Sequence, residues 1–104
     1  MLNKNKKSRM KEGFIYIISN PNFPGFYKIG VTHNISSRLK TYQTSSPHRN
    51  YKVEHYIYHP DCYKGEQEIK ENIKPFALSI KNEWIEISLP MVISRLQELI
   101  ECEE

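Results

Sequence analysis

The sequence predicts a small α+β domain, in which a mostly antiparallel sheet of three to four strands is covered by helices. At 104 residues the chain is long enough for one domain of this kind. Runs rich in β-branched and aromatic residues alternate with segments of helical periodicity, and clusters of Pro, Gly, Asn and Ser separate them. The expected order of elements is ββαβαβα.

Residues 1–12 are expected to form a disordered basic arm, followed by a single domain over residues 13–104. The arm contains five Lys or Arg residues and few apolar ones, so little hydrophobic surface is available to fold it. Such an arm either lies along a nucleic-acid backbone or only keeps the protein soluble, and the sequence does not separate the two.

The first two expected strands form a hairpin. Residues 14–19 are apolar with little alternation, which is typical of a central strand covered on both faces. Residues 20–25 are rich in turn formers and lead into a second strand over residues 26–31. Alternation places Lys28 and Gly30 on one face of that strand, and Gly30 would let another backbone or a ligand approach closely.

A helix is expected over residues 35–44. Ile35, Leu39 and Tyr42 recur at helical spacing and would form its inner face. Arg38 precedes Tyr42 by one turn on nearly the same face. We therefore expect Arg38 at the edge of a buried face, where an arginine needs an anionic partner.

The second half of the chain is also predicted to alternate between strands and helices. Residues 51–59 alternate apolar with polar side chains and predict a third strand, and residues 83–87 predict a short last strand followed by an amphipathic helix. Between them a helix is expected over residues 62–75, with Glu66 at the N-terminal end of its buried stripe. That stripe consists of Ile69, Ile73 and Phe76.

Charge is divided unequally along the chain, whose net charge is +3. Residues 1–53 contain ten basic residues and one acid, Glu12, whereas residues 54–104 contain five basic and eleven acidic residues. The asymmetry favours one face directed at a polyanion such as DNA, although two solvated surfaces would also produce it. The expected DNA contacts lie in the stretch without acids between Glu12 and Glu54, and are Lys28, Arg38, Lys40, Arg49 and Lys52.

No segment approaches the roughly 18 consecutive apolar residues of a membrane span, and no signal peptide is recognisable. We therefore expect an intracellular protein, in the cytoplasm or, for a protein of a eukaryotic virus, in the nucleus or a virus factory. Cys62 and Cys102 are expected to be free thiols. His55, His59 and Cys62 are too few, and too close to a strand, to predict a zinc site.

Candidates for chemistry are single residues, because no Gly-rich phosphate loop or nucleophile motif is present. Phosphodiester hydrolysis needs a group that activates water, a cation at the phosphoryl oxygens and usually a metal. Tyr16 suits the first task, because a neighbouring Lys28 would lower its pKa. Arg38 can bind a phosphate with two hydrogen bonds, and Glu66 can bind Mg²⁺ whose other ligands are water and phosphate.

Five short motifs support a resemblance to a known family. They cover residues 13–21, 28–32, 38–39, 66–73 and 83–85. In this order they resemble the GIY-YIG nuclease superfamily, and closest of all its branch of phage and viral orf-type, T5 orf172-like DNA-binding domains. The resemblance covers about residues 13–100 and implies the fold of that superfamily.

The resemblance implies a DNA endonuclease or nickase, a hydrolase that depends on Mg²⁺ or Mn²⁺. It implies that Tyr16 is the general base or orients water, that Arg38 stabilises the scissile phosphate, and that Tyr42 assists. Glu66 would bind the metal, with Glu68 as the alternative if the helix register differs by two.

Lys28 stands where the founding motif has the first tyrosine of YIG, and the named branch also carries lysine there. This departure leaves the proton pathway open. Two other functions also stay open: a DNA-binding module without catalysis, and a protein-interaction domain whose basic half is incidental. A single domain of this size would read a base sequence only as a homodimer or with a protein partner.

Overall fold

The computed structural model describes residues 11–102, which form a five-stranded sheet in the order β3-β1-β2-β5-β4. All four strand pairs are antiparallel. The elements along the chain are β1 (Gly13–Ser19), β2 (Phe26–Thr32), α2 (Ile35–Thr44), β3 (Lys52–His59), α3 (Cys62–Ile73), the 3₁₀ helix η1 (Lys74–Phe76), β4 (Ser79–Lys81), β5 (Trp84–Glu86) and α4 (Leu89–Cys102).

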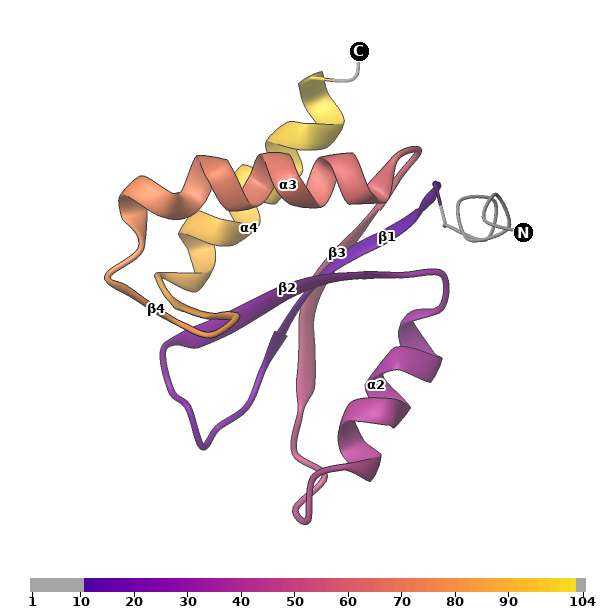
Figure 1. Ribbon diagram of the computed structural model, residues 1–104, viewed down its shortest axis with the longest axis vertical. Helices are drawn as coiled ribbons and strands as arrows, with labels where there is room; N and C mark the ends of the chain where they lie inside the picture. The colour runs from indigo at the N-terminus through magenta and orange to yellow at the C-terminus, as the bar shows by residue number, and fades with distance from the viewer. Residues whose placement is uncertain (1–10, 103–104) are drawn as a thin grey trace, which may run out of the picture.

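Helices cover both faces of this sheet. Figure 1 shows α3 and α4 together on one face and α2 on the other. Residues alternate along β1 accordingly: Ile15 and Ile17 belong to the core under α3 and α4, whereas Tyr16 reaches Tyr42 of α2. The predicted α+β class is confirmed, and β1 is an interior strand, as its apolar sequence indicates.

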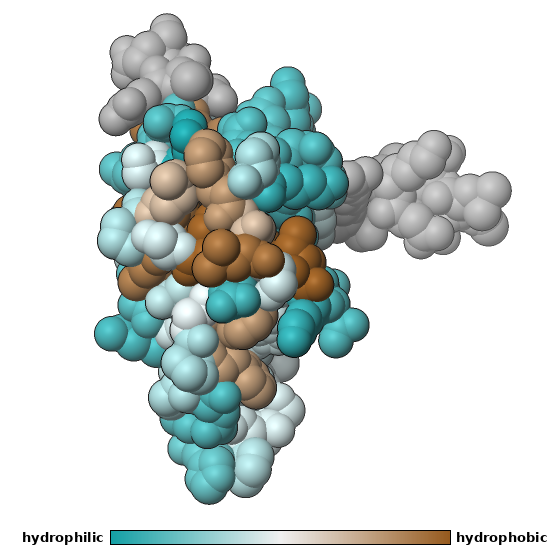
Figure 2. Space-filling model, turned by 90° about the vertical axis from the view of Figure 1, so that its left-hand side faces the viewer, coloured by the Kyte–Doolittle hydropathy of each residue, from teal (hydrophilic) through white to brown (hydrophobic). Residues whose placement is uncertain are grey.

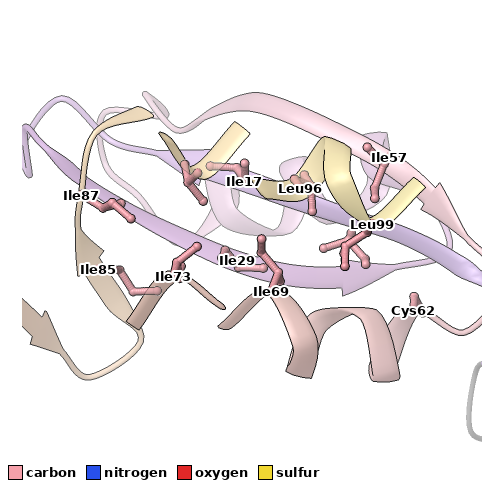
Figure 3. Packing of buried hydrophobic residues seen from close by; sticks show 12 residues of the cluster. Ile17, Ile29, Ile57, Cys62, Ile69, Ile73, Ile85, Ile87, Leu96 and Leu99 are labelled. Atoms are coloured by element: carbon pink, nitrogen blue, oxygen red, sulfur yellow. The ribbon is translucent and has the colours of Figure 1, made fainter. Parts of the chain in front are cut away.

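The core lies between the sheet and the α3–α4 pair. In Figure 3 isoleucines of the strands and leucines of α4 point toward one another across this layer. Burying each such side chain stabilises the fold by about 1.5–3 kcal/mol. The predicted stripe of α3 is confirmed at Ile69 and Ile73 but is wrong at Phe76, which is 42% exposed and lies under the Arg95 guanidinium at 4.7 Å.

The strand β4 is a difference from the predicted order, which becomes ββαβαββα. Residues 79–81 pair with β5 through a tight turn, in which Asn82 has a φ of 59°. Asparagine tolerates this left-handed conformation better than most residues. Together with the predicted last strand, β5, the strand β4 forms a hairpin that extends the sheet beyond β2, and β5 places Trp84 opposite Lys28.

Strand β3 contains a bulge. Ile17 is paired with His55 but the next residue, Ile18, is paired with Val53, so Glu54 is an extra residue on β3. The regular alternation expected over residues 51–59 is therefore wrong at this point. Because of the bulge, Val53 lies on the face of the sheet opposite to His55.

Helix α2 has the predicted bounds, but none of its residues is buried. The Asn34 side chain caps it by accepting a hydrogen bond from the backbone N–H of Ser37 at 2.9 Å. Leu39 and Tyr42 are half-buried against the sheet, as the periodicity predicts. Arg38, one turn before Tyr42, is exposed to solvent.

Residues 1–10, most of the predicted arm, lie outside the described residues. The two arm residues that are described contact the domain: the Lys11 carbonyl accepts a hydrogen bond from the N–H of Cys62 at 2.7 Å, and the Glu12 carboxylate accepts one from Tyr58 at 2.8 Å. Cys62 is a buried free thiol. No helix in residues 11–102 is long and apolar enough to cross a membrane.

Candidate nucleic-acid interface

Tyr16 is the central residue of the candidate site on the α2 face of the sheet. Its side chain is 2% exposed, and its hydroxyl lies 3.1 Å from the hydroxyl of Tyr42. The register of the hairpin places Tyr16 opposite Gly30. A Cβ at Gly30 would lie 2.6 Å from Cζ of Tyr16, so the missing side chain makes room for the phenol rather than for a ligand.

The electrostatics of Tyr16 differ from the expectation. Burial raises the pKa of the phenol far above its ordinary value of 10, and the hydrogen bond with Tyr42 raises it further. The positive charges of Arg38 and Lys28 lower this pKa, but by less. The predicted lowering is therefore wrong, because the loss of water around a phenolate outweighs its attraction to nearby cations. At neutral pH Tyr16 is protonated in the free protein.

Lys28 lies on the same face of the sheet and is held by a counterion. Its Nζ is 3.0 Å from Oε1 of Glu83 and 5.5 Å from the centroid of the Tyr42 ring. The Lys28 ammonium lowers the pKa of the Glu83 carboxyl, and Lys70 adds a smaller effect in the same direction. Sequence reasoning gave no role to Glu83, although it begins the last of the five motifs. A phosphate that binds Lys28 competes with this carboxylate for the ammonium.

The other predicted DNA contacts differ in their surroundings. Arg38 and Lys40 are exposed on α2, and Arg49 is exposed in the loop that follows. None of these three pairs with an acid within residues 11–102. Lys52, in contrast, lies 3.7 Å from Glu54, which partly neutralises it.

Glu66 does not lie beside Tyr16 and Tyr42. It lies on α3, the helix that covers the opposite face of the sheet, and its Oε2 is 3.0 Å from Nζ of Lys70. No hydrogen bond or ion pair within residues 11–102 joins Glu66 to Tyr16 or Arg38. Lys70, the partner of Glu66, also lowers the pKa of the Glu83 carboxyl that pairs with Lys28, but by less than Lys28 does. Glu68, the alternative, is exposed on the same helix.

The described residues contain no group of three or more His, Cys, Asp or Glu side chains that could hold a metal ion. Metals that need several protein ligands, such as structural zinc, therefore do not fit residues 11–102. A single carboxylate such as Glu66 fits a hard cation like Mg²⁺, which keeps water molecules and takes phosphate oxygens as its other ligands.

An aromatic row extends from Tyr16 toward the turn between β1 and β2. The Tyr42 ring lies 5.0 Å from Tyr51, Tyr51 stacks on Trp84 at 6.3 Å, and Trp84 meets Phe23 at 5.2 Å between centroids. Five separate segments contribute these rings, so no local sequence pattern predicts the row. The sequence hints at such a row only through its aromatic content of 12%.

One known domain family matches the stretch that holds the hairpin, the helix behind it and the later motifs. The sequence profile described as T5orf172 domain matches residues 13–103. The chain belongs to the T5orf172 domain family. The match includes every element from β1 to α4, so the site described above lies within the T5orf172 domain. Searches of curated proteins and of solved structures found no significant match.

Proposed function

We propose that this T5orf172 domain is a metal-dependent DNA endonuclease or nickase of the GIY-YIG type. The observation that carries the proposal is the grouping of the Tyr16–Tyr42 hydroxyl pair with Lys28 and Arg38 on one face of the sheet. These residues come from three elements, and their order along the chain is that of the GIY-YIG motifs. Membership in the T5orf172 family supports a nuclease-like or DNA-binding role.

In this proposal Arg38 and Lys28 bind the phosphate to be cleaved. The Arg38 guanidinium is exposed and carries no acidic partner within residues 11–102, so it is available for two parallel hydrogen bonds to phosphoryl oxygens. Lys28 releases the Glu83 carboxylate and binds the phosphate instead. Both cations then lie where negative charge develops on the phosphoryl oxygens in the transition state.

Tyr16 is better suited to orienting the attacking water than to deprotonating it. Its pKa is raised in the free protein, and the negative charge of a bound phosphate would raise it further. A protonated phenol can still accept a hydrogen bond from water through its oxygen while it donates to Tyr42. The proposal therefore keeps the water-orienting role and assigns no proton abstraction to Tyr16.

Glu66 is the residue that would hold the metal. A bound Mg²⁺ or Mn²⁺ would supply positive charge at the scissile phosphate. Lys70 would have to release the Glu66 carboxylate, which it pairs with at 3.0 Å. The Glu66 side chain is only 13% exposed, so a metal would reach its carboxylate only after this release.

A plasmid-nicking assay with Mg²⁺ or Mn²⁺ tests this function. Wild type should nick, and Arg38→Ala should lose about 100-fold or more in rate, the typical cost of one transition-state donor. Glu66→Gln should abolish nicking, whereas Glu71→Gln, an exposed carboxylate on the same helix, should not. The proposal fails if wild type and Glu66→Gln are equally inert on single-stranded, duplex and branched DNA.

A DNA-binding module without catalysis is the second candidate. The pairing of Glu66 with Lys70 on the far face of the sheet favours it, because within residues 11–102 no hydrogen bond joins a carboxylate to the tyrosine pair. This alternative predicts binding that Arg38→Ala weakens and Glu66→Gln leaves unchanged, with no strand cleavage by either protein. Whether the chain acts as a homodimer or with a protein partner is a further prediction, which sedimentation would test.

A further inference from the structure

The aromatic row ends in an open groove between the β1–β2 turn and the β4–β5 turn. The groove has a volume of about 620 Å³. Its walls include three aromatic rings, and two amides and one ammonium lie at its border. These residues are Phe23, Phe26, Trp84, Asn22, Asn82 and Lys81. Phe23 is 42% exposed, so an aromatic face is open to solvent beside Trp84.

We propose that this groove binds an unpaired nucleobase, so that the domain acts on single-stranded or locally unpaired DNA. This inference rests on the proposed function. Ring faces stack on any base, which is how proteins without sequence preference hold single strands. The Asn22 and Asn82 amides can donate to and accept from a base edge. In an intact duplex the base faces are stacked on one another and cannot enter.

Charge and continuity favour a nucleotide over an apolar protein segment. Lys81 is the charged side chain that lines the groove within residues 11–102, and its sign suits a phosphate. Trp84 is also the residue paired with Lys28 across β2 and β5. A base stacked against Trp84 therefore leaves its own backbone next to Lys28, the proposed phosphate contact of the cleavage site.

Exposed apolar residues near β4 suggest a competing occupant. Figure 2 views the side of the molecule that carries β4, and a band of apolar surface crosses it between hydrophilic regions. Leu78 and Ile80 are 78% and 50% exposed. A second copy of this chain could cover such a band, so the test must separate this occupant from DNA.

Trp84 is the single tryptophan of the chain, so intrinsic fluorescence reports on the groove. The full chain is titrated without divalent metal, with a short oligo(dT) and with an abasic oligonucleotide of equal length and charge. Oligo(dT) should quench the fluorescence. The abasic strand should bind about tenfold more weakly and leave the fluorescence unchanged, because it has phosphates but no bases to stack.

Two phenylalanines of equal exposure provide the matched variants. Phe23→Ala should weaken oligo(dT) binding about tenfold and leave the abasic strand unaffected. Phe76→Ala, also 42% exposed but outside the groove, should change neither. The inference is overturned if Phe23→Ala weakens both strands equally or neither. It is also overturned if Phe23→Ala dissociates a dimer in sedimentation while oligo(dT) binding is unchanged, since the groove would then be a protein interface.

The nicking assay separates this inference from the proposed function. If the chain nicks plasmid DNA and Phe23→Ala has no base-dependent effect, only the groove assignment fails. If wild type binds neither oligonucleotide nor duplex and nicks nothing, the proposed function fails and the groove assignment with it. The supporting result is quenching by oligo(dT) that depends on Phe23, together with a cleavage preference for unpaired DNA.

Discussion

Tyr16 and Gly30 occupy opposite positions on β1 and β2, and their side-chain volumes are complementary. The phenol lies in the space that a Cβ at Gly30 would fill. The first two motifs of the chain are therefore one packing unit, in which the glycine of the second determines where the tyrosine of the first can lie. The unit places the Tyr16 hydroxyl within reach of α2.

The raised pKa of Tyr16 leads to a prediction about stability at high pH. A phenol whose folded pKa exceeds its unfolded value of 10 keeps its proton in the folded state. Its stabilising contribution is complete below pH 10 and is lost as the pH rises toward the folded pKa. Above pH 10 the free energy of unfolding should therefore fall by about 1.4 kcal/mol per pH unit from this group alone.

Urea titrations from pH 8 to pH 11.5 measure this loss, and Tyr16→Phe removes it. The absorbance at 295 nm of wild type minus that of Tyr16→Phe isolates the ionisation of this one phenol. A midpoint at or below pH 10 in the difference titration would show that the nearby cations, Lys28 and Arg38, outweigh burial. Such a result would support a role for Tyr16 as the general base.

At the residue scale, the sequence predicts which side chains share a face but not their partners. Alternation along β2 correctly places Lys28 on the face of Gly30, because strand periodicity is local. The Glu83 counterion belongs to a distant segment, and only the hairpin of β4 and β5 brings it to Lys28. The same limit applies to Tyr16, since the degree of burial that sets its pKa is a property of the folded chain.

At the element scale, the helices and the long strands follow from periodicity, and the departures have local causes. β4 is three residues long, too short for alternation to be recognised. The bulge at Glu54 follows from the pairing of β3 with β1, which a single strand's sequence does not contain. Phe76 leaves the stripe of α3 because the helix ends at Ile73 before Pro75.

No residue of helix α2 is fully buried, and hydrogen bonds from its side chains help to hold it in place. The Gln43 side chain donates to the carbonyl of Tyr51 at 3.0 Å and accepts from its N–H at 2.9 Å. We predict that Gln43→Ala releases the end of α2, because it removes both bonds. Hydrogen exchange of the α2 amides should accelerate about tenfold, as expected for a loss of about 1.4 kcal/mol in the opening free energy.

Gln97 provides the control for this prediction. Its side chain makes an exposed hydrogen bond to His55 at 3.0 Å on the other face of the sheet, so Gln97→Ala should leave α2 exchange unchanged. If Gln43→Ala accelerates exchange throughout the sheet as well, α2 is part of the global folding unit and not a separately opening element. In either variant the amides of β1 and β2 should remain the slowest to exchange, since both of these long strands are paired on both sides.

At the scale of the whole molecule, folding partly cancels the charge division of the sequence. Lys28 from the basic half pairs with Glu83 from the acidic half, and Lys52 with Glu54 in the same way. The predicted DNA contacts that keep an unpaired charge within residues 11–102 are Arg38, Lys40 and Arg49, all on α2 or directly after it. The proposed DNA surface is therefore centred on α2, more narrowly than the sequence indicates.

The salt dependence of DNA binding tests this distribution of charge. With duplex DNA as the probe, each cation that binds a phosphate contributes about 0.9 to the magnitude of the slope of log affinity against log salt concentration. Arg38→Ala should therefore reduce the magnitude of the slope by about 0.9. Glu83→Gln should increase affinity at low salt, because it frees Lys28 from its counterion. Lys64→Ala removes an exposed lysine from α3 on the opposite face and should leave the slope unchanged. Equal slopes for Arg38→Ala and Lys64→Ala would mean that DNA responds to net charge alone, and that the α2 face has no special role.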